Sequence, residues 1–373
     1  MEIFEFNYAH KLKNYSPMIY KWAVDNNLSL FDFDNCMYTS NRLAVLEQHF
    51  VAVASKYSQV LIIEQHPFFD EEWNPFYESD DQYIETKTQI IEISNRLNLR
   101  LYFLTADYRY WDNSLNSRCF YPHWYFELRS HAKQFNYQNF NWPIDRKYNF
   151  SCNNMSNYRS EKIFNIIECV RRSRSDWILS LYDHPHEQAS LIDLTNLGIV
   201  RHDQIEIWNK QIKNKIKMYE YDLINNEPLS AMSTIFKGHT ESYCNLVIEH
   251  SMKIEILSEK SFKPFIAKQI PIYLAQAGAC EMLTKLGFDL FYDFINHNEY
   301  DAIGKGFVNS CPEPWIKRTS KLHALIDNLY TTKFCDFFTE ANTKHRLEKN
   351  NEHFYSNTID KMCIAKFNQL LNK

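Results

Sequence analysis

The sequence predicts an α/β protein of two Rossmann-like α/β/α domains that face one another across a cleft, followed by a helical C-terminal tail. A chain of 373 residues is too long for one ordinary core and fits two domains of roughly 150 to 200 residues each. Short apolar runs typical of buried parallel strands alternate with segments of helical periodicity through most of the chain. From Ile316 to Lys373 the pattern becomes that of charged helix without a strand signal.

The first part of the chain contains strand and helix patterns in alternation. The apolar runs Val60 to Glu64 and Leu99 to Thr105 are typical of buried strands, and Gln82 to Leu97 between them has helical periodicity. All six glycines lie at or beyond Gly198, so this half lacks the glycine-rich phosphate turn of a dinucleotide-binding fingerprint. The glycine distribution therefore excludes a standard NAD or FAD domain in this half.

The pattern breaks at Asn141 to Arg146, where Pro143 disfavours helix in the residue before it. We therefore expect an N-terminal domain over residues 1–143, a C-terminal domain over 144–315 and a helical tail over 316–373 that packs across both lobes. Gly287 stands where a left-handed helix cap is expected. In the second domain the sequence predicts strands at Tyr148 to Cys152, Trp177 to Tyr182, Cys244 to Glu249 and Ile270 to Leu274, and helices at Arg159 to Arg172, Lys260 to Lys268 and Ala279 to Leu286.

Composition limits the classes of protein that this chain can belong to. Hydrophobic residues make up 45% and aromatic residues 16%, which is enough apolar surface for a folded globular protein. The net charge of -5 argues against a dedicated DNA-binding protein. No run approaches the apolar length of a spanning helix, and the first residues lack the order of a signal peptide, so we expect a cytoplasmic protein without a membrane span. The nine cysteines show no C-x-x-C spacing, and we expect reduced core residues and no structural metal.

The stretch from Ser258 to Leu274 carries the most chemistry in the sequence. A loop with a hydroxyl, a carboxylate and an ammonium group opens a helix here, and the free N–H groups at a helix start favour an anion such as a pyrophosphate. Lys260 can neutralise phosphate charge, and Glu259 can accept hydrogen bonds from ribose hydroxyls. The alternative interpretation is a capped surface helix, with Ser258 as the N-cap and charged residues in the first turn.

This stretch resembles the S/T-E-K helix and the I-P-I/V strand of the donor-binding domain in fucosyltransferase-like enzymes. It is more similar still to a group of bacterial and viral glycosyltransferases with a T/S-E-K-x-x-K-P motif, a Pro-containing strand, a Gly turn, a Leu-x-x-x-Gly-Phe segment and a Tyr-Asp pair. The corresponding residues are Ser258 to Pro264, Pro271, Gly278, Leu283 to Phe288 and Tyr300-Asp301. Ser242 to Glu249 matches the strand before the motif, and Tyr148 to Asn154 with Arg159 and Lys162 resembles the first strand and turn of the same domain.

The resemblance covers Lys147 to Asp301 and implies an inverting glycosyltransferase with the two-lobed GT-B fold. It implies that the C-terminal domain holds a nucleotide-sugar donor and that the N-terminal domain binds the acceptor, either a glycan or a hydroxymethylated base of viral DNA. No essential cofactor or metal follows from the motif. A viral protein of this kind would act in the host cytoplasm. The implied donor-binding residues are Arg159 and Lys260 for the pyrophosphate, Glu259 for the ribose, and Ser258, Lys263 and Asn153 nearby.

An inverting transfer needs a base that takes the proton of the acceptor hydroxyl, usually a carboxylate at the cleft. Glu64 ends the Val60 to Glu64 strand, Asp107 follows the Leu99 to Thr105 strand, and Asp34 is part of Phe31 to Asp34, so all three are positioned where strand ends should meet the acceptor. Each of them also fits a loop or capping carboxylate. We place Glu64 first because the following Gln65 to Pro67 suggests a fixed loop.

A hydrolase is the alternative class. The segment Phe31 to Cys36 resembles the D-x-D start of haloacid-dehalogenase-type phosphatases, in which the first Asp is the nucleophile, the second is a general acid/base and Mg²⁺ lies between them. Asp32 and Asp34 would take these roles. Cys36 stands where that family has Thr or Val, and no acidic pair follows a later strand, so this resemblance is the less specific one.

Two further motifs allow other interpretations. The lysine run Lys210 to Lys217 is typical of a solvated helix face, and it could also guide a nucleic-acid acceptor. His184, His186 and Glu187 are chemically suited to zinc or manganese. Pro185 interrupts a regular helix, however, and no further ligand from a distant part of the sequence is identifiable. We interpret this segment as a loop at a strand end.

Overall fold

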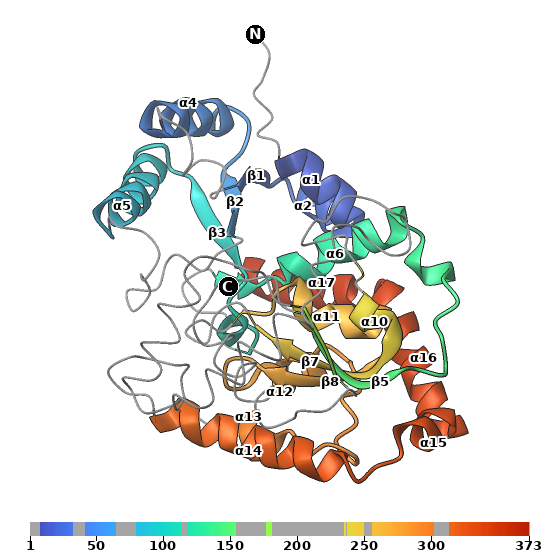
Figure 1. Ribbon diagram of the computed structural model, residues 1–373. Helices are drawn as coiled ribbons and strands as arrows, with labels where there is room; N and C mark the ends of the chain where they lie inside the picture. Colours follow the sequence, from blue (N-terminus) through green and yellow to red (C-terminus); the bar gives the residue numbers. More distant parts are fainter. Residues whose placement is uncertain are drawn as a thin grey trace. The chain divides into compact units, whose positions relative to one another are not determined.

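The computed structural model describes residues 8–32, 42–64, 80–112, 118–153, 177–180, 235, 237–249, 256–301 and 313–372. The chain forms two compact units, the first made of Met1–Ser130 with Asn357–Lys373 and the second of His131–Ser356. The first division falls inside α6 (His123–Gln134), before the boundary at 143/144 that the sequence suggests. The second division assigns the last helix, α17 (Thr358–Leu371), to the first unit. The expected C-terminal tail is therefore helical but is divided between the units (Figure 1).

The first unit is built on a parallel sheet of four strands in the order β1-β2-β3-β4. Two crossover helices, α4 and α5, contact one another on one side of the sheet, and α1 and α2 lie on the other side (Figure 1). Successive right-handed crossovers that advance in one direction place their helices on the same face. The strands are β1 (Ser29–Asp32), β2 (Gln59–Glu64), β3 (Arg100–Thr105) and β4 (Arg118–Phe120), and the helices are α1 (Tyr8–Tyr15), α2 (Pro17–Asp25), α4 (Arg42–Ala54) and α5 (Asp80–Arg96).

Alternating positions of these strands form the core under α4 and α5. Val60 and Ile62 of β2 share a buried cluster with Phe103 of β3, and Phe50 and Ile90 from the two helices complete it. The apolar runs of β2 and β3 and the helical spacing in α5 are the patterns from which the sequence predicted these elements. The expected α/β character of this part of the chain is confirmed.

A buried ion pair fixes the C-terminal helix in the first unit. Arg129 of α6 donates from Nη1 to Asp360 Oδ2 at 2.5 Å and from Nη2 to Oδ1 at 3.0 Å. The hydroxyl of Ser16 donates to the same carboxylate at 2.8 Å. The side chains of Arg129 and Asp360 are only 3% and 1% exposed, so this pair specifies the position of α17 more than it adds net stability.

The second unit contains a parallel sheet in the order β6-β5-β7-β8. The chain passes from β5 to β6 on one side and then returns to place β7 on the other side of β5. The strand order therefore reverses between β5 and β7, which is a topological switch point, and open α/β sheets bind ligands beyond the carboxyl ends of the strands at such a point. The strands are β5 (Tyr148–Asn153), β6 (Trp177–Ser180), β7 (Ser242–Ile248) and β8 (Ile270–Leu274).

Helices cover both faces of this sheet, with α10 and α11 on one side and α12 to α14 on the other (Figure 1). Every residue of β7 and β8 is buried. Leu246 and Ile272 pack with Leu322 of α14 on one face, and on the other face the hydroxyl of Tyr273 donates to the Ser261 carbonyl of α11 at 2.8 Å. The helices are α10 (Lys237–Glu241), α11 (Glu259–Ile266), α12 (Ala279–Lys285), α13 (Asn298–Asp301), α14 (Glu313–Leu329), α15 (Phe334–Thr339) and α16 (Ala341–Tyr355).

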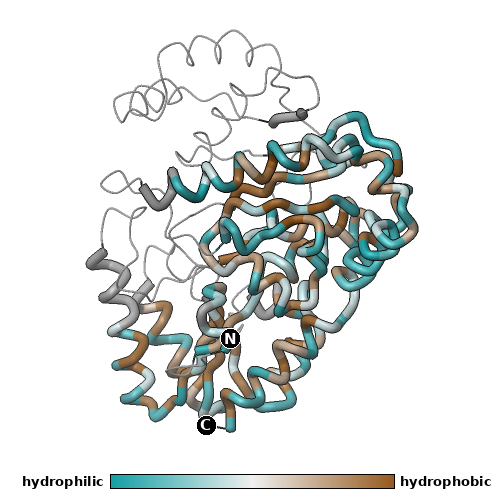
Figure 2. The backbone as a smooth tube through the Cα atoms, turned by 90° about the horizontal axis from the view of Figure 1, so that it is seen from below, coloured by the Kyte–Doolittle hydropathy of each residue, from teal (hydrophilic) through white to brown (hydrophobic). Residues whose placement is uncertain are grey.

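The helices of both units are amphipathic in the way that these faces require. Brown and teal residues alternate along them in Figure 2, as expected where one side of a helix packs on a sheet and the other meets water. In the described parts of the chain, no helix combines the length and the apolar character needed to cross a membrane.

One buried arginine holds the amino ends of the second sheet together. Arg146 lies just before β5, is 8% exposed, and uses all five of its N–H groups. Burial lowers the pKa of its guanidinium to about 10. The five acceptors are the backbone carbonyls of Pro143, His239, Ser242, Ala267 and Lys268, at 3.2, 3.0, 2.8, 2.9 and 3.2 Å.

Replacing Arg146 by Lys should destabilise the protein strongly although the charge is kept. A lysine has three donors, so at least two of the five carbonyls, three of which are in buried contacts, lose their partner, at a cost of about 1–3 kcal/mol for each buried one. We expect the free energy of unfolding, measured in urea, to fall by at least about 2 kcal/mol. The matched control is Arg96→Lys, because Arg96 pairs with Glu47 on the surface and both side chains are more than half exposed. Equal urea midpoints for the two variants would contradict the conclusion that Arg146 holds the amino ends of the second sheet together.

Candidate functional site

The carboxyl edge of the second sheet brings together most of the described residues that the sequence assigned to donor binding. Asn153 is the last residue of β5, and β5 neighbours β7. The chain leaves β7 at Ile248 and later enters α11, whose first turn carries Glu259 and Lys260. This edge is the switch point of the sheet. Arg159 lies outside the described residues.

The first turn of α11 is capped as expected, and most of it is buried. Ser258 is the N-cap, and its hydroxyl accepts a hydrogen bond from the Lys260 backbone N–H at 3.3 Å. Ser258 and Glu259 are 5% and 8% exposed, and Lys263 in the last turn of the same helix is 5% exposed. The capping part of the alternative interpretation is therefore correct, but its surface location is wrong. Charged residues buried at a helix start are unusual enough to need a structural or functional reason.

Glu249 supplies the structural part of that reason. It directly follows β7, is fully buried, and its backbone N–H donates to the Leu274 carbonyl at 3.0 Å. Its Oε1 accepts the Ser258 backbone N–H at 3.0 Å and also the Ser261 hydroxyl. Burial raises the pKa of the Glu249 carboxyl, while the nearby Lys260 ammonium and the two hydrogen bonds act in the opposite direction.

Sequence reasoning missed Glu249 as a site residue. The available signal was a single carboxylate at the end of an otherwise apolar strand, nine residues before the N-cap of the motif helix. A buried carboxylate is retained only when hydrogen bonds or a counter-charge compensate its desolvation, and here both are present.

Gln276 provides a further polar group at the same end of the sheet. It lies two residues beyond β8 and is 2% exposed. Its Nε2 has no hydrogen-bond partner among the residues that the structure describes. A buried amide of this kind is a donor that a ligand oxygen can satisfy.

The turn after α12 confirms the role expected for Gly287. This residue has φ +97°, and a Cβ built on it would lie 2.8 Å from His353 Nε2. The same nitrogen bonds the Leu286 carbonyl at 2.8 Å, so the imidazole occupies the space that a side chain would need. Gly287 is therefore required both for its left-handed backbone and for the close approach of α16.

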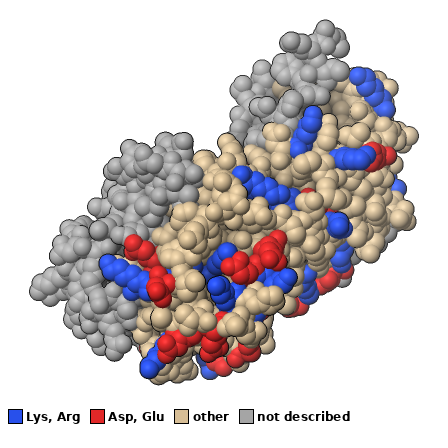
Figure 3. Space-filling view, turned by 90° about the vertical axis from the view of Figure 1, so that its right-hand side faces the viewer, with Lys and Arg blue, Asp and Glu red and all other residues tan. Residues whose placement is uncertain are grey.

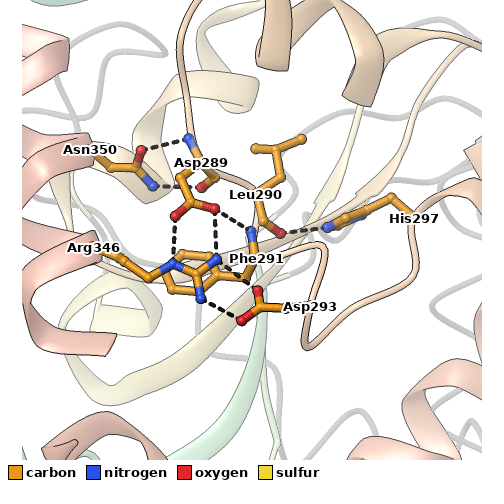
Figure 4. A network of polar contacts seen from close by, with 7 residues as sticks. All are labelled: Asp289, Leu290, Phe291, Asp293, His297, Arg346 and Asn350. Atoms are coloured by element: carbon orange, nitrogen blue, oxygen red, sulfur yellow. Dashed lines mark hydrogen bonds and ion pairs between the residues drawn. The ribbon is translucent and has the colours of Figure 1, made fainter. Parts of the chain in front are cut away.

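The segment after this turn is held on α16 by an arginine between two carboxylates (Figure 4). Arg346 Nη2 donates to Asp289 Oδ1 and to Asp293 Oδ1, both at 2.8 Å, and its guanidinium lies 4.3 Å from the centre of the Phe291 ring. Asn350 accepts the Asp289 N–H at 2.8 Å and donates to its carbonyl at 2.7 Å. The Arg346 hydrogen bonds hold the pKa of Asp293 below its ordinary value.

Helix α16 also contacts the end of the motif helix. The Asn351 amide donates to the carbonyls of Phe265 and Ile266 at 3.1 and 3.0 Å, and the Lys268 ammonium lies 2.7 Å from Glu348. The C-terminal end of α11 and the segment after α12 are therefore fixed on one common support.

A hydrogen-bonded chain links β8 to the Tyr-Asp pair of the resemblance. Tyr300 OH accepts the Tyr273 N–H at 3.2 Å and lies 2.6 Å from His297 Nδ1. His297 Nε2 lies 2.8 Å from the Leu290 carbonyl. Since a carbonyl only accepts, Nε2 carries the proton and Tyr300 donates to Nδ1. Burial lowers the pKa of His297 to about 4.

Asp301, the second member of that pair, has a structural environment. It is 5% exposed and lies 3.6 Å from the buried guanidinium of Arg318 in α14. Burial raises the pKa of the Asp301 carboxyl, and Arg318 together with the backbone N–H groups of Cys280 and Glu281 lowers it in part. The Asp301 carboxylate therefore accepts backbone hydrogen bonds at the first turn of α12.

The three expected base candidates belong to the first unit, and the structure describes them unequally. Glu64 is the last residue of β2 and is in register with Thr105 of β3, but its side chain is outside the described set. Asp107 follows β3 and is fully buried, with its backbone N–H 3.3 Å from the Thr105 hydroxyl. Asp34 lies outside the described residues, and Asp32 is the last residue of β1.

The same end of the first sheet carries a polar group that the sequence pattern alone did not single out. His123 begins α6 shortly after β4, is 1% exposed, and its Nε2 lies 3.1 Å from Glu127 Oε2. Tyr15 donates to the other oxygen of Glu127 at 3.2 Å, and burial raises the pKa of Tyr15 to about 12. The His-x-x-x-Glu spacing at a helix start was the signal for this contact.

On the face shown in Figure 3, the described basic and acidic residues are interspersed. Within the described ranges, no three His, Cys, Asp or Glu residues gather as metal ligands would. The lysine run Lys210 to Lys217 and the His184 to Glu187 segment lie outside those ranges.

The chain was compared with protein-family models, with curated proteins and with solved structures, and it matches none of them.

The neutral state of His297 should make stability depend on pH. Its pKa is lowered to about 4 in the folded protein and is about 6.5 in an unfolded chain, so the unfolded state binds more protons between these values. Stability from this group is fully present above pH 6.5 and is lost as the pH falls towards 4, by up to about 3 kcal/mol. Urea unfolding of His297→Gln from pH 4 to 7 should give a shallower dependence than that of the wild type.

His49 provides the matched control for this titration, because burial also lowers its pKa to about 4 but it belongs to the first unit. His49→Gln should remove a separate part of the pH dependence, and the double variant should remove both. Parallel curves for wild type and His297→Gln would show that His297 is not buried in its neutral form.

Proposed function

We propose that this chain is an inverting glycosyltransferase that moves a sugar from a nucleotide-sugar donor to an acceptor hydroxyl. The observation that carries the proposal is the position of the Ser258 to Lys260 turn. The motif that resembles glycosyltransferase donor sites lies at the carboxyl edge of a parallel sheet with a switch point. The GT-B arrangement of the two units is part of the same proposal.

The chemistry of the turn suits a leaving nucleoside diphosphate. As the bond between the sugar and the β-phosphate breaks, negative charge grows on the phosphate, and the Lys260 ammonium and the α11 N-terminus stabilise it. Glu259 accepts hydrogen bonds from the ribose, and Lys263 and Ser258 support the same turn. Arg159 and Asn153 complete the proposed donor site, and the Gln276 amide is an additional donor at that edge.

The acceptor hydroxyl attacks the anomeric carbon from the face opposite the departing phosphate and gives its proton to a carboxylate. Glu64 is the first candidate, because it ends β2 at the carboxyl edge of the first sheet. Asp34 is the second. Asp107 is the weakest of the three since its side chain is fully buried. The acceptor is a glycan or a hydroxymethylated base in viral DNA.

The alternative is a Mg²⁺-dependent phosphatase that uses Asp32 as nucleophile and Asp34 as acid/base. The position of Asp32 at the carboxyl end of β1 is compatible with it. The buried Ser258 to Lys260 turn and its Glu249 support have no role in that reaction, so we rank it second.

A thermal-shift screen tests the proposal directly. Wild type and Lys260→Ala are incubated with GDP, UDP, CMP and dTDP, with and without Mg²⁺. A ligand that binds only the native state at about 100 times its Kd stabilises it by about 2.7 kcal/mol. We expect one nucleoside diphosphate to raise the Tm of the wild type without Mg²⁺, and the Lys260→Ala variant to lose this response.

The matched control is Lys285→Ala, which removes a partly exposed lysine of the same unit that pairs with Glu281. Its nucleotide response should equal that of the wild type. If no nucleotide stabilises the wild type, and if Mg²⁺-dependent phosphatase turnover is abolished by Asp32→Asn, the transferase proposal fails and the hydrolase replaces it.

A further inference from the structure

A fully buried carboxylate lies directly behind the proposed phosphate-binding turn. Donor sites for nucleoside diphosphates are expected to concentrate positive charge, so a negative group at this position needs an explanation. Glu249 is 0% exposed, and the Ser258 N–H and the Ser261 hydroxyl both point to its Oε1. These two residues lie on either side of Glu259 and Lys260 in the sequence.

The hydrogen bonds of Glu249 determine the geometry of the turn. The Ser258 backbone is held by the carboxylate, and the Ser258 hydroxyl in turn accepts the Lys260 N–H at 3.3 Å. Ser261 is held by the same oxygen and by Tyr273, whose hydroxyl donates to the Ser261 carbonyl. The residue before Glu259 and Lys260 is thus fixed to Glu249 at the end of β7, and the residue after them is fixed both to Glu249 and to β8.

The charge of Glu249 has a separate effect. The side chain of Lys260 is partly buried, its Nζ atom is shielded from solvent, and its ammonium attracts the Glu249 carboxylate. A diphosphate that binds Lys260 competes with the Glu249 carboxylate for the ammonium group. The negative charge of the carboxylate also repels the diphosphate. Hydrogen bonding and charge therefore have opposite effects on ligand affinity.

We propose that Glu249 is a positioning residue of the donor site, which shapes the Ser258 to Ser261 turn and serves as the counter-charge of Lys260 while no donor is bound. This inference rests on the proposed function. Glu249 lowers the affinity for the free nucleoside diphosphate, which carries more negative charge than the nucleotide-sugar, and so it favours departure of the product.

The two effects separate in two substitutions. Glu249→Gln keeps an oxygen that can accept both hydrogen bonds and removes the charge, whereas Glu249→Ala removes both. Calorimetric titration with GDP, UDP, CMP and dTDP should show Glu249→Gln binding the preferred nucleotide about tenfold more tightly than the wild type at pH 8 and low salt. Glu249→Ala should bind about tenfold more weakly, because the turn loses its support.

The pH dependence gives a readout that a purely structural role would not change. The ratio of wild-type to Glu249→Gln dissociation constants cancels the protonation of the nucleotide itself. Burial raises the pKa of Glu249, so the ratio should approach one as the pH falls and the carboxyl takes up a proton. Glu281→Gln is the charge control, since Glu281 is an exposed carboxylate of the same unit, and it should leave the affinity unchanged.

The outcomes distinguish the inference from the function beneath it. Both the inference and the proposed function are supported if Glu249→Gln binds the nucleotide more tightly than the wild type and if the ratio of their dissociation constants approaches one at low pH. If the wild type binds a nucleotide that Lys260→Ala does not, and Glu249→Gln binds it equally or more weakly at every pH, the inference is overturned and the donor site remains. If the wild type binds none of GDP, UDP, CMP and dTDP, the proposed function fails and the inference fails with it.

Discussion

The second unit depends on the guanidinium of Arg146. Its five carbonyl partners come from the segment before β5, the region around the end of α10 and the start of β7, and the end of α11 just before β8. Parallel strands run in one direction, so a group that aligns their starts also sets where their ends lie. The proposed donor site at the carboxyl edge is therefore positioned by a cation at the opposite edge, where it also meets the negative ends of two helix dipoles.

The two faces of this sheet serve different purposes. The face towards α14 is apolar and supplies the core through residues such as Leu246 and Ile272. The face towards α11 contains buried hydrogen bonds, including those of Glu249 and Tyr273 with the motif helix. Apolar packing tolerates small shifts, whereas buried polar groups require exact partners. The polar face is therefore the one that can hold the Ser258 to Ser261 turn in a single conformation, while α16 supports the C-terminal end of α11.

Local patterns in the sequence were sufficient for six of the eight described parallel strands and for the position of the motif helix, whereas no range was predicted for the short strands β1 and β4. The strand Ile270 to Leu274 agrees with β8 at both ends, and the cap at Gly287 follows from the residue type alone. Arg146 and Glu249 could not be recognised in the same way, because their partners are fixed only by the tertiary fold; Lys268, for example, is 122 residues from Arg146. The motif helix was also open to interpretation as a surface helix, since charged first turns are normally solvated and only the structure shows this one buried.

The ion pair between Arg129 and Asp360 joins residues that are 231 positions apart in the sequence. During synthesis the whole second unit leaves the ribosome before Asp360 does, and domains generally fold as units while the chain emerges. The first unit therefore cannot form the ion pair between Arg129 and Asp360 until α17 has been synthesised. A chain that ends before residue 358 would therefore keep every residue of the second unit and would lack one partner of the ion pair in the first unit.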